Sequence, residues 1–501
     1  MAYTAELALP LMMSGEAKRD ASLFKGPLTA FASVLSGYFI LAAGSLYWLL
    51  TAAGALGAQV FPHSLIKRWP LAWLIASTGL TAALTQAVPG FFPDYSNPRE
   101  VLCEISLWLS LGLTARAYLV YTEYADTFDG LNASIASCPL ERLLSRVLHH
   151  PIDAVFARVW IANSVLMIPL TTLLILPNAI NYFVIVAYAT ALLLGQFPQE
   201  VLEHTNIHTR IFSPKVGASP RIKTLLKALQ FYYEYVFALL TSRVPGFYRV
   251  QHVYVHHVED NGPLDTQTTL PYDRTSFLDF SRHAFWQGLD LVSGGLLIGY
   301  LAKKGKTRQI REVVRGLAIW YAALLAVALV NPLAAAYLFL SRFLGGTFIT
   351  LITFYQHGLV DPDEMHEVHA HTIDYAGSEH GNLGFDYHVE HHSRPARHWS
   401  HYYEEFTRAA EKDAGHPAIV MQKDQFGPLA LVAALWRKDY PAIARYARLR
   451  GVSADDSQEL ARIVRERARP IGAPERSGIS AHIDALVTQV MAVALPKSFA
   501  V

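Results

Sequence analysis

Three short histidine motifs and one isolated histidine carry the potential chemistry of this chain. The motifs read H-x-x-x-H, H-x-x-x-H-H and H-x-x-H-H, and each lies at the polar edge of a long apolar stretch. Residues three or four positions apart share one face of a helix, so each motif can direct several imidazoles toward one point. Imidazole binds iron, copper and zinc, and nine ligands are too many for one ion. We therefore expect a dinuclear metal site whose ligands are His204, His208, His252, His256, His257, His357, His388, His391 and His392.

The first motif and the lone histidine also have simpler structural explanations. H-x-x-x-H alone occurs on ordinary surface helices, and His357, at the end of an apolar run, could cap a helix C-terminus. The two motifs with a double histidine have no evident packing reason beside a membrane, and together they favour the metal site. Six further histidines are expected mostly in an exposed polar loop: His366, His369, His371, His380, His398 and His401.

Carboxylates close to the motifs are expected to orient the metal ligands. A metal-bound imidazole usually donates its other N–H to a carboxylate or a carbonyl. Six acidic residues lie near enough in sequence: Glu203, Glu259, Asp260, Asp265, Asp386 and Glu390. Asp265, Asp386 and Glu390 are the leading candidates, and the sequence does not choose among them.

The composition predicts an integral membrane protein. Of 501 residues, 52% are hydrophobic and 17% are charged, whereas about 25% of an average soluble domain is charged. The net charge of +1 gives no reason to expect a nucleic-acid partner. Two cysteines are too few for a disulfide framework or an iron–sulfur cluster. The start, MAYTAELALPLMM, has no basic segment before its apolar patch, so no cleaved signal peptide is expected.

The apolar runs predict an all-α bundle of about six transmembrane helices. Groups that share metal ions must lie on one side of the membrane, so an even number of crossings must separate His257 from His357. Run 285–301 is short, carries Asp290 and leads into the basic segment 303–315, so we interpret it as interfacial. Run 101–121 carries charges and is interpreted in the same way. The six predicted spans are 28–56, 71–92, 155–176, 180–194, 316–330 and 333–354.

These spans imply three parts and an orientation. Residues 1–150 form a transmembrane pair with an interfacial segment, 151–402 a catalytic domain built on the last four spans, and 403–501 a charged helical tail. The last two spans form a hairpin that turns at Asn331-Pro332, and Arg342 within it is expected to snorkel or pair. Segment 222–240 is expected to be a helix lying in the interface. The basic segment 303–315 places the histidine-rich helical cap on the cytoplasmic side.

Two stretches resemble the histidine boxes of the membrane-bound fatty acid desaturase and hydroxylase superfamily. NLGFDYHVEHHSRP, residues 382–395, is similar to the third box of fatty acid desaturases. QHVYVHHVEDNGPLDTQTT, residues 251–269, is similar to a second box, but its three-residue gap departs from the commoner H-x-x-H-H of acyl desaturases. That gap, and the lone histidine in FYQHGLV, are closer to the alkane hydroxylases. The resemblance covers roughly residues 150–402.

The resemblance implies two non-haem irons, O2 as co-substrate and oxidation of an unactivated C–H bond on a fatty acid or acyl lipid. It favours desaturation, with hydroxylation and alkene-forming decarboxylation of a fatty acid as alternatives. Electrons are expected from a separate donor of the ferredoxin, rubredoxin or cytochrome b5 type. Segment 303–315 could dock an acidic donor, although a basic cytoplasmic loop explains it as well. A bacterial inner membrane is expected because no eukaryotic targeting signal is present.

Two other classes of protein are less well supported. A metal transporter would need ionisable residues inside the spans, and the last four spans are nearly free of acids. An intramembrane zinc hydrolase would need H-E-x-x-H, but Thr205 follows His204, which leaves no general-base glutamate at that place.

Overall fold

The computed structural model describes residues 127–176, 188, 192, 199–412, 418–422, 428–450, 457–472 and 479–494. The chain divides into two compact units. One comprises Met1–Leu113 and Val165–Gly195, and the other comprises Thr114–Ser164 and Gln196–Val501. All the histidine motifs belong to the second unit. The predicted spans 28–56 and 71–92 and the interfacial run 101–121 lie outside the described residues, as does most of 180–194.

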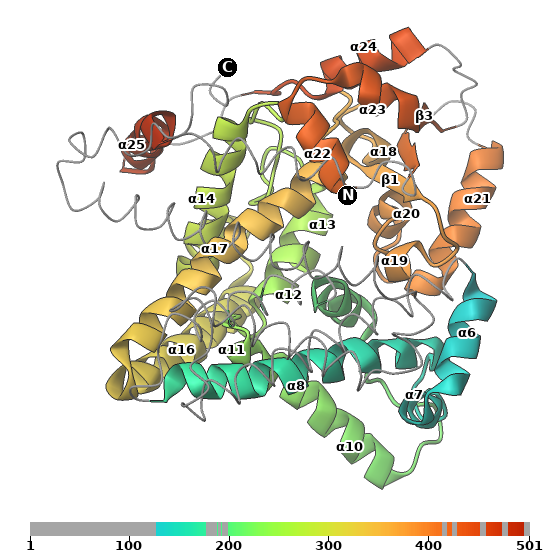
Figure 1. The fold of residues 1–501 in the computed structure, drawn as a ribbon, viewed down its shortest axis with the longest axis vertical. Helices are drawn as coiled ribbons and strands as arrows, with labels where there is room; N and C mark the ends of the chain where they lie inside the picture. The colour runs from blue at the N-terminus through green and yellow to red at the C-terminus, as the bar shows by residue number, and fades with distance from the viewer. Residues whose placement is uncertain are drawn as a thin grey trace, which may run out of the picture. The chain divides into compact units, whose positions relative to one another are not determined.

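The described chain is mostly helical, as the sequence predicts (Figure 1). Two of the described helices, α16 (Thr307–Val330) and α17 (Pro332–His357), are long and apolar enough to cross a membrane. They are joined at Asn331, whose side chain accepts a hydrogen bond from the N–H of Ala334 and so caps α17. The predicted hairpin turn at Asn331-Pro332 is thus confirmed. The run 155–176 forms α8 (Phe156–Ile175).

The run that contains Asp290 is broken into two helices. α14 (Phe277–Ser293) ends at Gly294, which has φ +69°, and α15 (Gly295–Lys303) follows. Asp290 Oδ1 accepts the N–H groups of Leu296 and Leu297 at 2.8 and 3.1 Å, so the acid caps the second helix. A helix break with a cap explains why an acidic residue occurs in this apolar run.

Close contact between α14 and α17 depends on two glycines. A Cβ atom added at Gly346 would lie 2.2 Å from the backbone nitrogen of Gly288.

Arg342 of α17 donates from Nε to the carbonyl of Leu291 at 3.3 Å and lies over the ring of Phe247 at 5.5 Å. The arginine is therefore held by a carbonyl and an aromatic face within the helix packing.

Two helical segments widen locally into π-helix. The predicted helix over 222–240 is present as α10 (Pro220–Phe231), the π-helix η3 (Tyr232–Phe237) and α11 (Ala238–Leu240). The second box spans α12 (Phe247–Gln251), the π-helix η4 (His252–His256) and α13 (His257–Glu259). π-Helical turns are rare and occur frequently at functional sites.

A three-stranded sheet adds to the predicted all-helical architecture. Strands β1 (Ile373–Ala376), β2 (Ile419–Gln422) and β3 (Ala447–Leu449) lie in the order β1-β2-β3. β1 pairs parallel with β2, with Ile373 opposite Ile419, and β2 pairs antiparallel with β3. The sheet joins the loop before the third box to the C-terminal segment.

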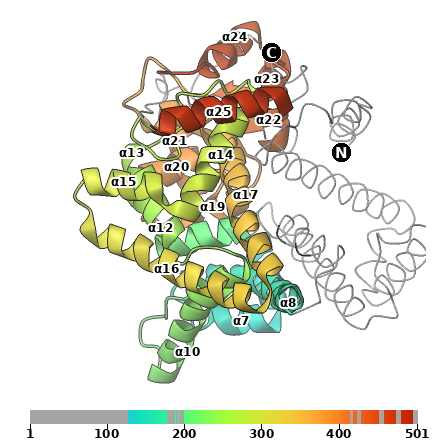
Figure 2. The same cartoon turned by 90° about the vertical axis from the view of Figure 1, so that its left-hand side faces the viewer.

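The remaining elements are short helices that surround the site (Figures 1 and 2). Before the first box come α6 (Phe128–Ser137), α7 (Pro139–Ser145) and η2 (Pro151–Val155). Around the third box lie α18 (Val368–His371), α19 (Gly381–Gly384), α20 (His388–Ser393) and η5 (Trp399–His401). The tail contains α21 (Tyr402–Lys412), α22 (Pro428–Trp436), α23 (Tyr440–Tyr446), α24 (Ser457–Arg467) and α25 (Ile479–Ala494).

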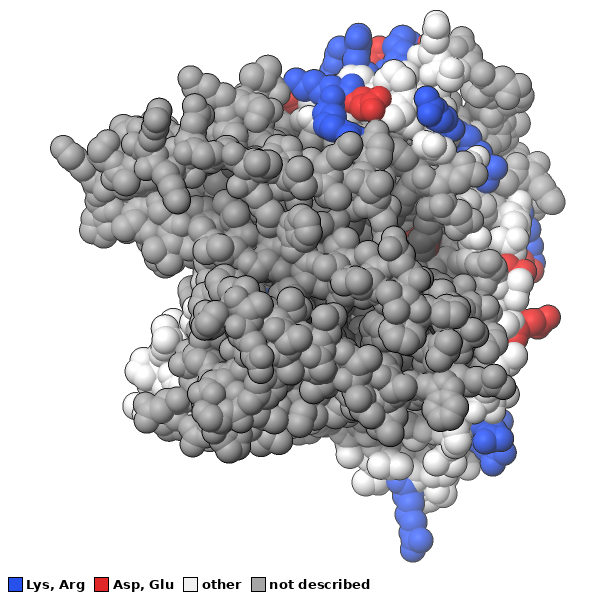
Figure 3. Space-filling model, in the orientation of Figure 1, with Lys and Arg blue, Asp and Glu red and all other residues white. Residues whose placement is uncertain are grey.

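The described part of the tail contains five helices and the two strands β2 and β3, and it packs on the rest of its unit. Lys and Arg side chains gather at the top of the view in Figure 3, where Figure 1 shows α23 and α24. α25 packs across α14 (Figure 2), and its Asp484 accepts hydrogen bonds from Arg282 at 2.5 Å and Trp286 at 2.7 Å. The tail is therefore joined to α14, which packs against α17, the helix that ends at His357.

Candidate metal centre

The structure gathers all nine histidines singled out by the sequence into two groups. Within each group, one nitrogen from every imidazole lies within 4.8 Å of those of the others. The five-histidine group contains His204, His208, His252, His257 and His391. The four-histidine group contains His256, His357, His388 and His392.

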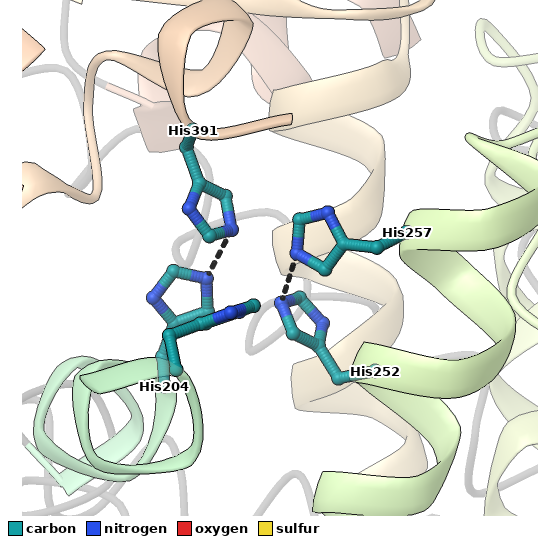
Figure 4. A group of neighbouring side chains, drawn as sticks. His204, His252, His257 and His391 are labelled. Atoms are coloured by element: carbon teal, nitrogen blue, oxygen red, sulfur yellow. Dashed lines mark hydrogen bonds between the residues drawn. The ribbon is translucent and has the colours of Figure 1, made fainter. Parts of the chain in front are cut away.

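The five-histidine group is assembled by three helical segments (Figure 4). His204 and His208 lie one turn apart on the helix 199–209 and face the π-helical second box. His204 Nε2 lies 2.9 Å from His391 Nε2, and His257 Nε2 lies 3.0 Å from His252 Nε2. The imidazoles therefore point toward one another from separate elements.

The π-helix explains how the H-x-x-x-H-H spacing serves this group. In an α-helix, residues five positions apart are about 140° apart around the axis, so His252 and His257 would point in different directions. The N–H of His257 instead donates to the carbonyl of His252, which is the i→i+5 bond of a π-helix. That bond places both imidazoles on one face.

The four-histidine group is built around the C-terminus of α17. His388 Nε2 lies 2.9 Å from His357 Nε2. His388 and His392 are one turn apart on α20, whereas His391 between them belongs to the other group. His256 and His257 are divided in the same way. Each double histidine thus contributes to both groups.

The donor geometry suits metal ions. Two imidazole nitrogens bound about 2.1 Å from one ion at right angles would be about 3.0 Å apart, and three Nε2–Nε2 separations are 2.9, 3.0 and 2.9 Å. Within the described part of the chain, the buried Nε2 atoms of His208 and His392 have no hydrogen-bond partner. A metal ion would satisfy these atoms, which are costly to bury unpaired.

The protonation states also suit metal binding. Burial lowers the pKa of His204, His252 and His391 well below the usual histidine value, and neighbouring imidazoles add to the effect. Burial lowers the pKa of His208 to about 3. The neutral imidazole is the form that binds metals, so these side chains are ready to act as ligands at neutral pH.

The comparison with known families follows this geometry. Residues 184–423 match the family model described as fatty acid desaturase, and this range contains all nine histidines. This match defines a desaturase domain and supports the membrane fatty acid desaturase and hydroxylase family that the histidine boxes resemble. No curated protein and no solved structure matches the chain. The matched family consists of oxidoreductases that are membrane-bound and use iron.

Two carboxylates orient histidines of the desaturase domain. Asp265 Oδ2 lies 2.6 Å from His256 Nδ1, and Asp260 Oδ1 lies 2.6 Å from His392 Nδ1. Both contacts are made by Nδ1 of histidines in the four-histidine group. An N–H donated from Nδ1 leaves the Nε2 lone pair available to a metal.

Three uncharged groups contact Nδ1 atoms of other desaturase-domain histidines. His357 Nδ1 donates to the carbonyl of His371 at 2.7 Å. His391 Nδ1 lies 3.2 Å from the hydroxyl of Tyr402, which itself donates to the carbonyl of Arg397. The amide of Gln356 lies 3.1 Å from His388 Nδ1. The sequence offered no signal for Tyr402 or for the His371 carbonyl, because both depend on how loops return to the site.

The other acidic residues near the motifs contact partners other than the nine histidines. Glu390 accepts from Arg450, and Asp386 accepts from Asn382 at 3.2 Å. Glu203 pairs with Arg243. Glu259 accepts from the hydroxyl of Tyr300 at 2.5 Å and pairs with Lys304 at 2.9 Å.

The expectation that most remaining histidines are exposed is wrong for four of the six. His366 and His401 are exposed, but His369, His371, His380 and His398 are buried. His369 contacts Glu364 at 2.6 Å, and His398 contacts Asp153 at 3.0 Å. Their burial depends on contacts that the sequence did not reveal, such as the stacking of the His398 ring on His150 at 3.8 Å between centroids.

Proposed function

We propose that this chain is a membrane-bound di-iron enzyme that uses O2 to oxidise an unactivated C–H bond on an aliphatic acyl chain. The observation that carries the proposal is the sorting of nine histidines into two adjacent, imidazole-only groups. One iron would be held by the five-histidine group and the other by the four-histidine group. Bound irons would supply the oxidising power, with O2, that removes hydrogen from a C–H bond.

The residues of this chain would orient the histidine ligands and exclude water from the site. Asp265, Asp260 and the His371 carbonyl hold three imidazoles with Nε2 turned toward the ions. Seven of the nine histidines are buried and the other two are partly exposed, which limits the access of water to the site. These features support the family assignment independently of the motif spacing.

Desaturation of a fatty acyl chain is the leading reaction, because the third box is the most specific match to acyl desaturases. Hydroxylation is the second candidate, since His357, the lone histidine of the alkane hydroxylase pattern, lies 2.9 Å from His388 in the four-histidine group. Alkene-forming decarboxylation uses the same oxidant and is a third outcome. The three differ by small shifts in substrate placement.

The setting that we propose is a bacterial inner membrane, with about six spans in total. α16 and α17 would cross the bilayer, and their length and apolar composition support this. The basic residues before and within the first turns of α16 support a cytoplasmic position for the histidine groups, by the positive-inside rule. Electrons would come from a separate ferredoxin, rubredoxin or cytochrome b5-type donor.

Metal content and product mass test the proposal together. Detergent-purified protein is expected to contain about two irons per chain, and oxygen-dependent products should form from free fatty acids of medium to long chain. Loss of two hydrogens, gain of oxygen or loss of the carboxyl group identifies the reaction. Zinc, or no metal with no oxygen consumption, would overturn the proposal.

Histidine variants assign the irons to the two groups. His388→Ala should lose the iron of the four-histidine group and His391→Ala the iron of the five-histidine group, each with loss of turnover. His401→Ala is the matched control, because His401 lies on the exposed surface close to the third box. Full activity and two irons in either ligand variant would refute the assignment.

A further inference from the structure

The C-terminal segment inserts a buried arginine beside the third histidine box. Arg450 directly follows β3 and lies beyond residue 423, where the match to the family ends. Its backbone N–H donates to the carbonyl of Ala418 at 2.9 Å, which extends the β2–β3 pairing by one step. Only 6% of the Arg450 surface is exposed. Its position beside β3 therefore places the guanidinium in the interior.

The guanidinium of Arg450 contacts two buried carboxylates. Nη2 donates to Glu390 Oε1 at 2.5 Å, and Nη1 lies 3.6 Å from Asp374 Oδ2. Nη2 also donates to the carbonyl of Phe406 at 3.0 Å, and the cation lies 4.9 Å from the centre of the Phe406 ring. A planar guanidinium can make these contacts at once, whereas a lysine ammonium cannot.

Both carboxylates act on the helix that carries the third box. Glu390 belongs to α20 and lies between His388 and His391. Asp374, on β1, accepts the N–H of Val389 through Oδ1 at 2.9 Å, at the start of the same helix. Arg450 therefore joins the first turn of α20 and its central acidic side chain to the C-terminal sheet.

The position of α20 affects both histidine groups. This helix of six residues supplies His391 to the five-histidine group and His388 and His392 to the four-histidine group. A small rotation of such a short helix would move ligands of both groups together. The contacts of Arg450 oppose that rotation.

We propose that Arg450 is a positioning residue for the metal centre, which holds α20 so that its three histidines face their two groups. This inference rests on the proposed function, because it assumes that both groups bind metal. It assigns a role in metal binding to the C-terminal segment outside the family match. It also predicts that loss of Arg450 weakens the binding of both irons. Loss of a group that contacts a single histidine ligand would weaken the binding of only one.

The test compares iron release from full-length variants in detergent. Arg450→Met and the double variant Glu390→Gln/Arg450→Met are loaded with Fe(II), and release to a chelator is followed at a temperature well below the unfolding transition. In the double variant only one of the two carboxylates that Arg450 contacts, Asp374, is left without the arginine, which reduces the risk of misfolding. We expect both irons to be released about 10- to 100-fold faster than from the wild type.

Two further variants separate positioning from general stability. Arg450→Lys keeps the charge but not the planar contacts, so release should be intermediate. Arg282→Met is the control, because it removes a tail contact with Asp484 that does not involve α20; its iron release should match the wild type. Wild-type rates of iron release from Arg450→Met and from the double variant, or faster release of only one of the two irons, would overturn the inference. A wild-type protein that binds no iron would instead refute the proposed function.

Discussion

Replacing Asp265 with asparagine should weaken the binding of one iron and leave the binding of the other unchanged. The Asp265 carboxylate accepts three hydrogen bonds: from His256 Nδ1 at 2.6 Å, Gln267 N at 2.9 Å and Asn261 N at 3.2 Å. Only 4% of Asp265 is exposed, so water cannot replace these contacts. An asparagine amide offers one oxygen and one NH2 group in place of the two oxygens.

The size of the effect follows from this geometry. If the amide oxygen faces His256, the NH2 group faces the N–H of Gln267, and a buried donor without an acceptor costs about 1–3 kcal/mol. That cost lowers the stability of the metal-free and metal-loaded protein alike. The hydrogen bond to His256 also loses its charge, and removing such a partner weakens metal binding about 10- to 100-fold, or about 1.4–2.7 kcal/mol.

Biphasic iron release to a chelator measures this effect. His256 belongs to the four-histidine group, so one iron per chain should leave Asp265→Asn at a 10- to 100-fold lower chelator concentration, while the second follows the wild-type curve. Glu364→Gln is the matched control, because Glu364 contacts His369 at the same 2.6 Å but outside both groups. Wild-type affinity for both irons, or joint loss of both, would refute the reasoning.

Two further predictions concern stability, measured as the unfolding temperature in detergent. Gly346→Ala places a Cβ 2.2 Å from Gly288 N and should destabilise the α14–α17 contact by about 1–3 kcal/mol, whereas Gly345→Ala, with its nearest neighbour at 3.6 Å, should be neutral or stabilising; equal unfolding temperatures for the two variants would contradict this. Burial raises the pKa of Asp290 from 3.8 to about 6, so its stabilising contribution is complete below about pH 4 and is lost as the pH rises through 6. Asp290→Asn should remove this pH dependence while its amide oxygen still accepts from Leu296 and Leu297, and an unchanged pH profile would disprove it.

The sequence predicted the parts of the site that depend on local periodicity. Eight of the nine histidines have helical spacings and His357 ends an apolar run, and the structure gathers all nine into two groups. The hairpin turn was also predictable, because asparagine followed by proline is a strong signal for a helix start. Asp265 lies close in sequence to the histidine that it contacts, so proximity along the chain identified it.

Contacts between distant segments were not predictable in the same way. Arg450 is 60 residues from Glu390, and no pattern in the tail marks it. The strands that bring it there have three or four residues each, too few for an alternating pattern to stand out. Glu390 was one of several candidates to orient a histidine because it lies near the third motif, but its side chain contacts Arg450 instead.

The π-helix of the second box changes how motif spacing should be compared between relatives. An extra residue in H-x-x-x-H-H, relative to H-x-x-H-H, is accommodated by one wider turn, because the His257 N–H bonds to the His252 carbonyl. The motifs H-x-x-x-H-H and H-x-x-H-H can therefore present equivalent ligands, and they differ by a single inserted residue. An alignment that scores this insertion as a change of chemistry would separate enzymes whose metal sites are alike. The number of residues between the histidines indicates whether the segment is α-helical or π-helical. The type of reaction must be inferred from the residues that contact the substrate.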